Sequence, residues 1–201
     1  MKKIFYILLL VVIAVFNLRA QQDKLSFYRV DTIQSKILWK CDKHNGLIKL
    51  KDGGFVVDEK LLPVGGKFII DMHSIKDLDM DPKQYGTAVL IFENTLKNEF
   101  FEADKYPYAY FDLQEVEKIT GDLYQLTGDF TLHGITNCIR FKAHMDITKT
   151  SLLMRSEKFA IDRTDWGIYR MSPKRPYADD ENGWTVQDRI DLKIILKAYR
   201  E

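Results

Sequence analysis

The chain has 201 residues, 46% of them hydrophobic, and its 30 basic and 29 acidic residues leave a formal net charge of +1. Basic and acidic side chains are interspersed, which excludes the single-sign stripe that binds nucleic acid. A chain of this length predicts one domain of ordinary size once any leader is removed.

The first twenty residues have the pattern of a secretory signal peptide. Lys2 and Lys3 form a basic start, residues 4–16 are an unbroken apolar run, and Ala20 is the small residue before the expected cut. The run is short for a membrane span, which favours cleavage; an uncleaved N-terminal anchor stays as the alternative. We therefore expect residues 1–20 to be removed and residues 21–201 to be periplasmic or secreted, with no membrane span after cleavage.

Alternation of apolar and polar residues dominates the rest of the sequence. The pattern is clean over residues 124–133, resumes after a turn at 134–137, and returns in the last strand. Gly53 and Gly54 interrupt one segment and predict a bulge or a sharp bend. The spacing predicts about eight antiparallel strands, with residues 25–30 as part of the first strand or its lead-in. They are expected at residues 35–43, 46–58, 64–72, 108–117, 124–133, 139–147, 152–163 and 190–197.

One segment departs from this alternation. Asp81 and Pro82 have the sequence of an N-cap followed by proline at the first helical position. Apolar residues then recur at helical spacing, at Tyr85, Val89, Phe92 and Leu96. We expect one amphipathic helix over residues 82–98 that caps the barrel or packs on it. Residues 164–185 form the longest irregular stretch, and loops of that length are usually functional or mobile.

The chain has two cysteines, and alternation places them on opposite faces. Cys41 shares a strand face with Trp39, whereas Cys138 shares one with Arg140 and Lys142. An inward and an outward side chain rarely have compatible Cβ directions, so we expect no disulfide between them even in an oxidising compartment.

Three pairs of stretches are similar to motifs of the YceI-like polyisoprenoid-binding family. They are residues 39–46 (WKCDKHNG) with 65–75 (GGKFIIDMHSI), residues 100–111 (FFEADKYPYAYF) with 126–136 (LTGDFTLHGIT), and residues 161–168 (IDRTDWGI) with 188–192 (DRIDL). They occur in the family's order and cover nearly the whole chain after the leader. The sequence departs from the family at residues 92–96, at Cys41, where relatives often have glycine, and over residues 169–184.

This resemblance implies an all-β fold, an eight-stranded antiparallel lipocalin-like β-barrel. It also implies a lumen that holds a long isoprenoid or similar apolar lipid, and an exported protein, since many members are periplasmic. On that basis the chain is expected to bind lipid for transport, storage or sequestration. It is not expected to be an enzyme, and it is expected to use no cofactor.

Inward-facing residues are the candidate ligand-binding set. They are Trp39, Phe55, Phe68, Phe111, Gly128, Phe130, Phe141, Ala143 and Met145. A small barrel either fills its interior with side chains or holds one ligand. The small inward residues at Ala109, Gly128 and Ala143 favour a cavity. The alternative is a filled barrel that acts as a non-catalytic interaction module, and a homodimer is left open.

His44, Arg163 and Trp166 are the candidates for the barrel mouth or for contact with a lipid head group. Arg163 is expected to hold Asp162 or Asp165, with head-group binding as the alternative. Cys41 near His44 leaves a hydrolase as the third hypothesis, although an inward strand cysteine is more often a small buried hydrophobe. The four histidines show no compact zinc-site spacing, so no metal site is expected.

Overall fold

The computed structural model describes residues 24–42, 44–174 and 185–201, so the expected leader lies outside the described residues. Strands of one antiparallel sheet make up most of the molecule. Their bounds are β1 Ser26–Val30, β2 Lys36–Cys41, β3 His44–Val57, β4 Pro63–Asp77, β5 Tyr108–Thr120, β6 Leu123–Leu132, β7 Ile135–Ile147, β8 Ser151–Ser156, β9 Phe159–Asp162 and β10 Arg189–Arg200.

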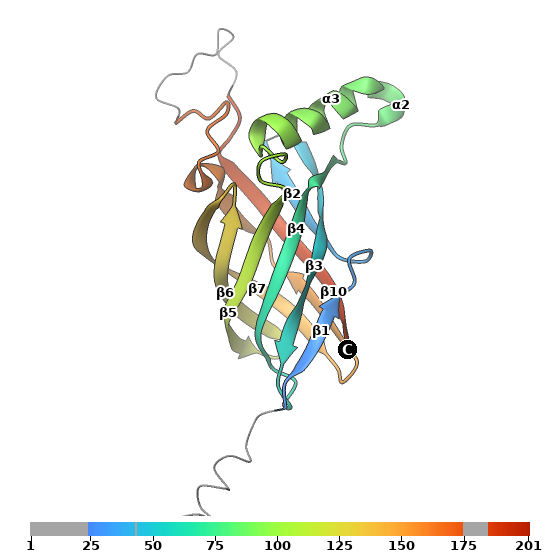
Figure 1. Ribbon diagram of the computed structural model, residues 1–201, viewed down its shortest axis with the longest axis vertical. Helices are drawn as coiled ribbons and strands as arrows, with labels where there is room; N and C mark the ends of the chain where they lie inside the picture. Colours follow the sequence, from blue (N-terminus) through green and yellow to red (C-terminus); the bar gives the residue numbers. More distant parts are fainter. Residues whose placement is uncertain (1–23, 43, 175–184) are drawn as a thin grey trace, which may run out of the picture.

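Eight of these strands close into a ring. Their order is β10, β2, β3, β4, β5, β6, β7 and β8, and β8 pairs back to β10. Closure leaves no long free sheet edge in this ring. The predicted eight-stranded antiparallel barrel is confirmed (Figure 1).

The two remaining strands, β1 and β9, each share a position in the ring with a neighbouring strand. β1 and β2 both pair with β3 and β10, so they occupy one strand position that residues 31–35 interrupt. β8 and β9 share the position on the other side of β10 and are separated by Glu157 and Lys158. The continuous strand expected over residues 152–163 is therefore wrong: the chain makes two shorter strands along β10.

The helical segment lies across one end of the barrel (Figure 1). It consists of α2 Pro82–Tyr85, α3 Thr87–Thr95 and a π-helical turn Leu96–Phe100. Asp81 accepts a hydrogen bond from the Lys83 amide at 2.9 Å, which confirms the predicted N-cap. Gly86, with φ of 54°, separates α2 from α3, so the expectation of one unbroken helix over residues 82–98 is wrong.

The helix presents its apolar side to the barrel only after this break. Val89 is buried, and Phe92 and Leu96 pack against the core, whereas Tyr85 is exposed. Among the described residues, no helix combines the length and the apolar character needed to cross a membrane.

The turn between β6 and β7 is shorter than expected. Leu132 pairs with Ile135, which leaves only His133 and Gly134 as the loop, with φ of 53° and 77°. Two successive positive φ angles are the geometry of a type I′ hairpin turn. The turn expected over residues 134–137 is therefore replaced by a two-residue turn.

The end of the barrel away from the helix is filled by side chains. Figure 1 places β1 and the C-terminus at this end. Its buried residues include Tyr28, Val57, Leu113, Ala143, Leu152 and Ala198. We call this half the filled end, and the half beneath α3 and the π-helical turn the mouth.

Candidate functional site

An internal cavity of about 400 Å³ occupies the barrel between its middle and the mouth. This volume lies in the range of small-molecule sites, which is about 300–1,000 Å³. Most of the lining side chains are aliphatic or aromatic. They come from every strand from β2 to β10 and from the helical segment, and they include Ile37, Leu50, Ile70, Phe92, Leu96, Phe100, Ala109, Leu126, Met154, Phe159, Ile190 and Ile194.

Phenylalanine rings form a band around the cavity wall. Phe55 and Phe68 meet edge to face with centroids 4.8 Å apart. Phe111 lies 6.3 Å from Phe68 and 5.7 Å from Phe141, and Phe141 stacks on Phe159 at 4.6 Å. Such pairs are favourable beyond the area that they bury, so the band holds the wall in shape while leaving an apolar surface.

Six of the nine predicted lumen residues line this cavity. They are Trp39, Phe55, Phe68, Phe111, Phe130 and Phe141. Ala109, expected to leave room, also lines it. Gly128, Ala143 and Met145 are not among the lining residues.

These three lie where side chains already fill the space. A Cβ atom at Gly128 would stand 2.4 Å from the Asp112 carbonyl oxygen and 2.7 Å from the Phe111 ring, so that ring takes the room the glycine leaves. Ala143 and Met145 are buried towards the filled end. The expectation that Gly128 and Ala143 widen the lumen is corrected, because alternation identifies inward residues but not depth along the barrel.

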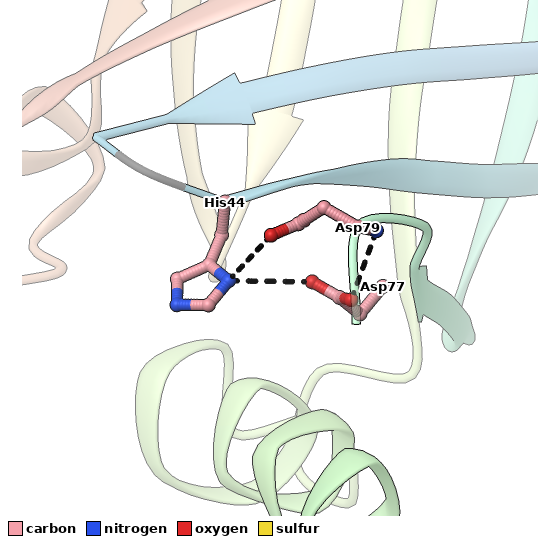
Figure 2. Close-up of side chains that lie close together, drawn as sticks. All are labelled: His44, Asp77 and Asp79. Atoms are coloured by element: carbon pink, nitrogen blue, oxygen red, sulfur yellow. Dashed lines mark hydrogen bonds and ion pairs between the residues drawn. The ribbon is translucent and has the colours of Figure 1, made fainter. Parts of the chain in front are cut away.

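At the mouth, His44 meets two carboxylates from the end of β4. The strand expected to stop at residue 72 continues to Asp77, after a register shift relative to β3. Asp77 pairs with Gly46, and the Leu78 amide donates to the Asn45 carbonyl oxygen at 2.9 Å. This register places the first residue of β3, His44, beside Asp77 and Asp79 (Figure 2).

Each carboxylate binds backbone with one oxygen and faces His44 with the other. Asp77 Oδ1 accepts from the Met80 amide at 2.7 Å, and Asp79 Oδ1 accepts from the Asn45 amide at 2.8 Å. Their Oδ2 atoms lie 3.5 Å and 3.2 Å from His44 Nδ1. Burial raises the pKa of Asp77. Burial alone would also raise the pKa of Asp79, but the hydrogen bond from the Asn45 amide and the nearby side chains of Asp77 and His44 lower it.

The same cluster contacts the helix. The His44 ring lies on Phe92 with centroids 4.3 Å apart, and Glu93 accepts from the Asp77 amide at 3.2 Å. Sequence reasoning selected His44 but missed Asp77, Asp79 and Glu93. The alternation of Ile75, Asp77 and Asp79 after the expected strand end was the available signal.

Arg163 has a different partner from the one expected. Its guanidinium is buried, forms an ion pair with Asp188 at 3.1 Å, and does not contact the carboxylates of Asp162 or Asp165. It also donates to backbone carbonyl oxygens inside the 164–185 stretch, at Ile168 and Arg170, and directly after it, at Val186 and Gln187. Arg163 therefore fastens this stretch to the start of β10, and burial lowers its pKa.

Trp166 is held in the wall and does not line the cavity. Its indole N–H donates to the Phe130 carbonyl oxygen at 3.0 Å, and its ring meets Phe130 edge to face. His133 is half-buried, with Nε2 3.2 Å from Glu102 and its ring against Tyr106. The positive φ of His133 turns its side chain out of the strand alternation.

The two cysteines lie where alternation predicted. Cys41 lines the cavity and donates to the Gln187 carbonyl oxygen at 3.3 Å, whereas Cys138 is exposed, and both are free thiols. Burial raises the pKa of the Cys41 thiol. A raised pKa lowers the fraction of reactive thiolate, and His44 directs Nδ1 to Asp77 and Asp79. This arrangement does not activate Cys41 as a nucleophile.

Comparison with known proteins agrees with this architecture. Solved structures of similar fold include BcnA of Burkholderia cenocepacia, with a TM-score of 0.65 and 18% identity, covering 84% of this chain and 99% of that one. A polyisoprenoid binding domain from Saccharophagus degradans has a TM-score of 0.58 and 12% identity, covering 89% and 100%. The YceI protein of Campylobacter jejuni has a TM-score of 0.54 and 19% identity, covering 81% and 84%.

The sequence itself matches at two levels. A UPF0312 protein of Photorhabdus laumondii is 28% identical over 125 residues, which is 62% of this chain and about half (54%) of that relative's length. The model of the YceI-like domain matches residues 28–198, from within β1 to within β10. The chain therefore belongs to the YceI-like family.

Proposed function

We propose that this protein holds a long apolar lipid chain, an isoprenoid or one of similar shape, in the barrel cavity. The observation that carries this proposal is the cavity of about 400 Å³, lined mainly by aliphatic and aromatic side chains. Hydrocarbon makes no hydrogen bonds, so its affinity comes from buried area, about 0.8 kcal/mol per CH₂ before ordering costs. The apolar wall supplies such area.

Polar groups at one end of the cavity support an orientation for the ligand. Asp42, His44 and Arg163 line the cavity at the mouth, whereas the wall below them is apolar. A lipid with a polar end would lie with that end towards α3 and its hydrocarbon towards the filled end. The structural similarity to a polyisoprenoid binding domain supports this class of ligand.

The biological role that fits a binding barrel is transport, storage or sequestration of the lipid outside the cytoplasm. The leader pattern of residues 1–20 supports export. N-terminal sequencing of the protein from separated cell fractions tests this. Export predicts an N-terminus near Gln21 in the extracytoplasmic fraction. An uncleaved N-terminus in the cytoplasmic fraction would contradict it.

The structure gives less support to two other functions. An interaction module with a filled barrel needs no cavity, so the cavity favours lipid binding over it. A hydrolase using Cys41 and His44 needs an activated thiol, whereas burial raises the pKa of Cys41. Lipid binding is therefore the function that the geometry supports best.

The direct test is native mass spectrometry of the protein purified from its own host, followed by solvent extraction and lipid identification. We expect an added mass that denaturation releases and that extraction identifies as an apolar lipid. The same protein, stripped of lipid, should take up a labelled polyprenyl alcohol. A native mass equal to that of the protein alone, together with no binding of the labelled polyprenyl alcohol, would contradict lipid binding.

A further inference from the structure

We propose that His44, Asp77 and Asp79 form a binding site for a divalent transition-metal ion, with zinc the best fit, at the mouth of the barrel. The three side chains converge from two strand ends, and no residue between them separates their free ligand atoms (Figure 2). The proposal concerns the mouth alone and does not depend on which lipid the cavity holds.

The distances are those of a small coordination sphere. His44 Nδ1 lies 3.2 Å from Asp79 Oδ2 and 3.5 Å from Asp77 Oδ2. Ligands bound to zinc at about 2.0–2.1 Å in tetrahedral geometry are separated by about 3.3–3.4 Å. Each of the three residues offers a ligand atom within 4.8 Å of the other two. One ion can therefore reach all three after a side-chain adjustment, which leaves a fourth position for water or for an oxygen of a bound ligand.

The free carboxylate oxygen of Asp77 points independently to a ligand. The Asp77 side chain is 0% exposed, and its Oδ2 has no hydrogen-bond donor among the described residues, apart from its ion-pair approach to His44 Nδ1. His44 Nδ1 is likewise buried and makes no hydrogen bond, and only the two carboxylate oxygens approach it. A buried carboxylate oxygen with no donor is costly, and a cation placed between these atoms would satisfy all of them.

The rest of the cluster holds the ligands in place. The Oδ1 atoms of Asp77 and Asp79 are fixed by the backbone amides of Met80 and Asn45, so both carboxylates are oriented before any ion arrives. The His44 ring is supported by Phe92. Fixed outer partners of this kind raise metal affinity. The side chains of His44 and Asp79 are 38% and 29% exposed, which provides a route for the ion.

The donor set selects the kind of ion. One imidazole nitrogen with two carboxylate oxygens suits zinc and its transition-metal neighbours, whereas calcium takes six to eight oxygens and magnesium retains most of its waters. Binding requires His44 to carry its proton on Nε2, so that Nδ1 is free to coordinate.

The test is calorimetric titration of zinc chloride into tag-free, chelator-treated protein. We expect one zinc per chain and an affinity that falls by about tenfold or more in Asp77→Asn and in His44→Ala. Asp77→Asn is the sharper variant because the amide oxygen still accepts from Met80 and keeps the loop. His144→Ala is the matched control, since His144 pairs with the single exposed carboxylate of Asp122 at 3.1 Å and should bind no zinc of its own.

A second measurement keeps the result independent of folding defects. Cobalt added to the parent protein should give the visible absorption bands of tetrahedral coordination, and zinc should abolish them. Circular dichroism confirms that each variant is folded, and if His44→Ala is not, Asp77→Asn decides. Failure of the parent to bind zinc, undiminished binding in Asp77→Asn, or loss of binding in His144→Ala would overturn the proposal.

Discussion

Trp39 on β2 lies directly opposite Gly46 on β3, and a Cβ atom at position 46 would come within 2.5 Å of the indole ring. The same atom would stand 1.9 Å from the Lys76 carbonyl oxygen. Position 46 therefore needs glycine, because the Trp39 ring and the Lys76 carbonyl oxygen leave no room for a Cβ atom. The same contact helps to position the residues at the mouth, because Asp77 pairs with Gly46 and His44 lies two residues before Gly46.

The first prediction concerns this contact. Gly46→Ala should lower the free energy of unfolding by at least about 1–3 kcal/mol, because neither the indole nor the β4 backbone can move aside freely. Gly65→Ala is the matched control, since its Cβ would meet only the Leu113 carbonyl oxygen at 3.5 Å. That variant should stay within about 0.5 kcal/mol of the parent in urea denaturation. Equal loss in both variants would show that the Trp39 contact is not the cause.

The second prediction concerns the buried Arg163–Asp188 pair. Arg163→Ala should cost about 3–5 kcal/mol, because it leaves Asp188 buried and four carbonyl oxygens without their donor. Arg163→Lys should not rescue it, since one ammonium cannot replace a planar fork of donors. Arg189→Ala, which breaks a pair with Asp191 at an arginine 68% exposed, should cost at most about 1 kcal/mol. Thermal and urea unfolding of the three variants measure the differences.

The number of strands in the closed ring could be predicted from the sequence, whereas the continuity of each strand could not. Alternation of apolar and polar residues indicates which side chains face the core. The pattern is strong in a barrel wall that has one face in solvent and the other in the core. The break at Glu157 and Lys158 depends instead on how β8 and β9 pair with β10, far along the chain. Local pattern carries no information about that pairing.

The same limit applies to the site. Six lumen residues could be predicted because every second strand residue points inward, but depth along the barrel is set by strand tilt and by the side chains of other strands. Asp188, the partner of Arg163, lies 25 residues further along the chain, where no local pattern connects it to Arg163. Asp77 and Asp79 were missed because the register shift in β4 carries the strand beyond its expected end.

The third prediction is a pH dependence at Asp162. Burial alone would raise its pKa, but hydrogen bonds from Lys174 and Thr164 lower it from 3.8 to about 2. A folded pKa below the unfolded one contributes stability that is fully present above about pH 4 and is lost as the pH falls to about 2. The difference in unfolding free energy between the parent and Asp162→Asn should therefore shrink over that interval.

Removing the cation tests the cause of this pKa. In Lys174→Met, the carboxylate keeps its bonds from the Thr164 amide and hydroxyl but loses its ion pair. The pH-dependent difference should become smaller and shift to higher pH. Urea unfolding at several pH values measures it, and an unchanged profile would assign the low pKa to Thr164 alone.

The fourth prediction uses the two free thiols. In native protein, an alkylating reagent should modify exposed Cys138 quickly and Cys41 slowly, because burial raises the pKa of Cys41 and limits access to it. Because Cys41 lines the cavity, lipid loading should slow its reaction further and leave Cys138 unchanged. Mass spectrometry of tryptic peptides measures both rates. A peptide linking Cys41 to Cys138 would contradict the strand registers.

The last prediction concerns the lumen. Ala109 is 1% exposed and lines the cavity, so Ala109→Phe should place a ring where the lipid chain lies. Displacing two CH₂ groups of the ligand would weaken binding roughly tenfold, at about 0.8 kcal/mol each, and a phenyl ring displaces more. Tyr110→Leu, on the exposed side of the same strand, is the control and should bind as the parent does.

His44→Ala should retain most of the affinity, since an imidazole at the mouth adds little to hydrocarbon burial. One labelled polyprenyl ligand and these four proteins suffice. Parent-like binding by Ala109→Phe would place the chain elsewhere, and loss of binding in His44→Ala alone would mean that the polar end dominates recognition.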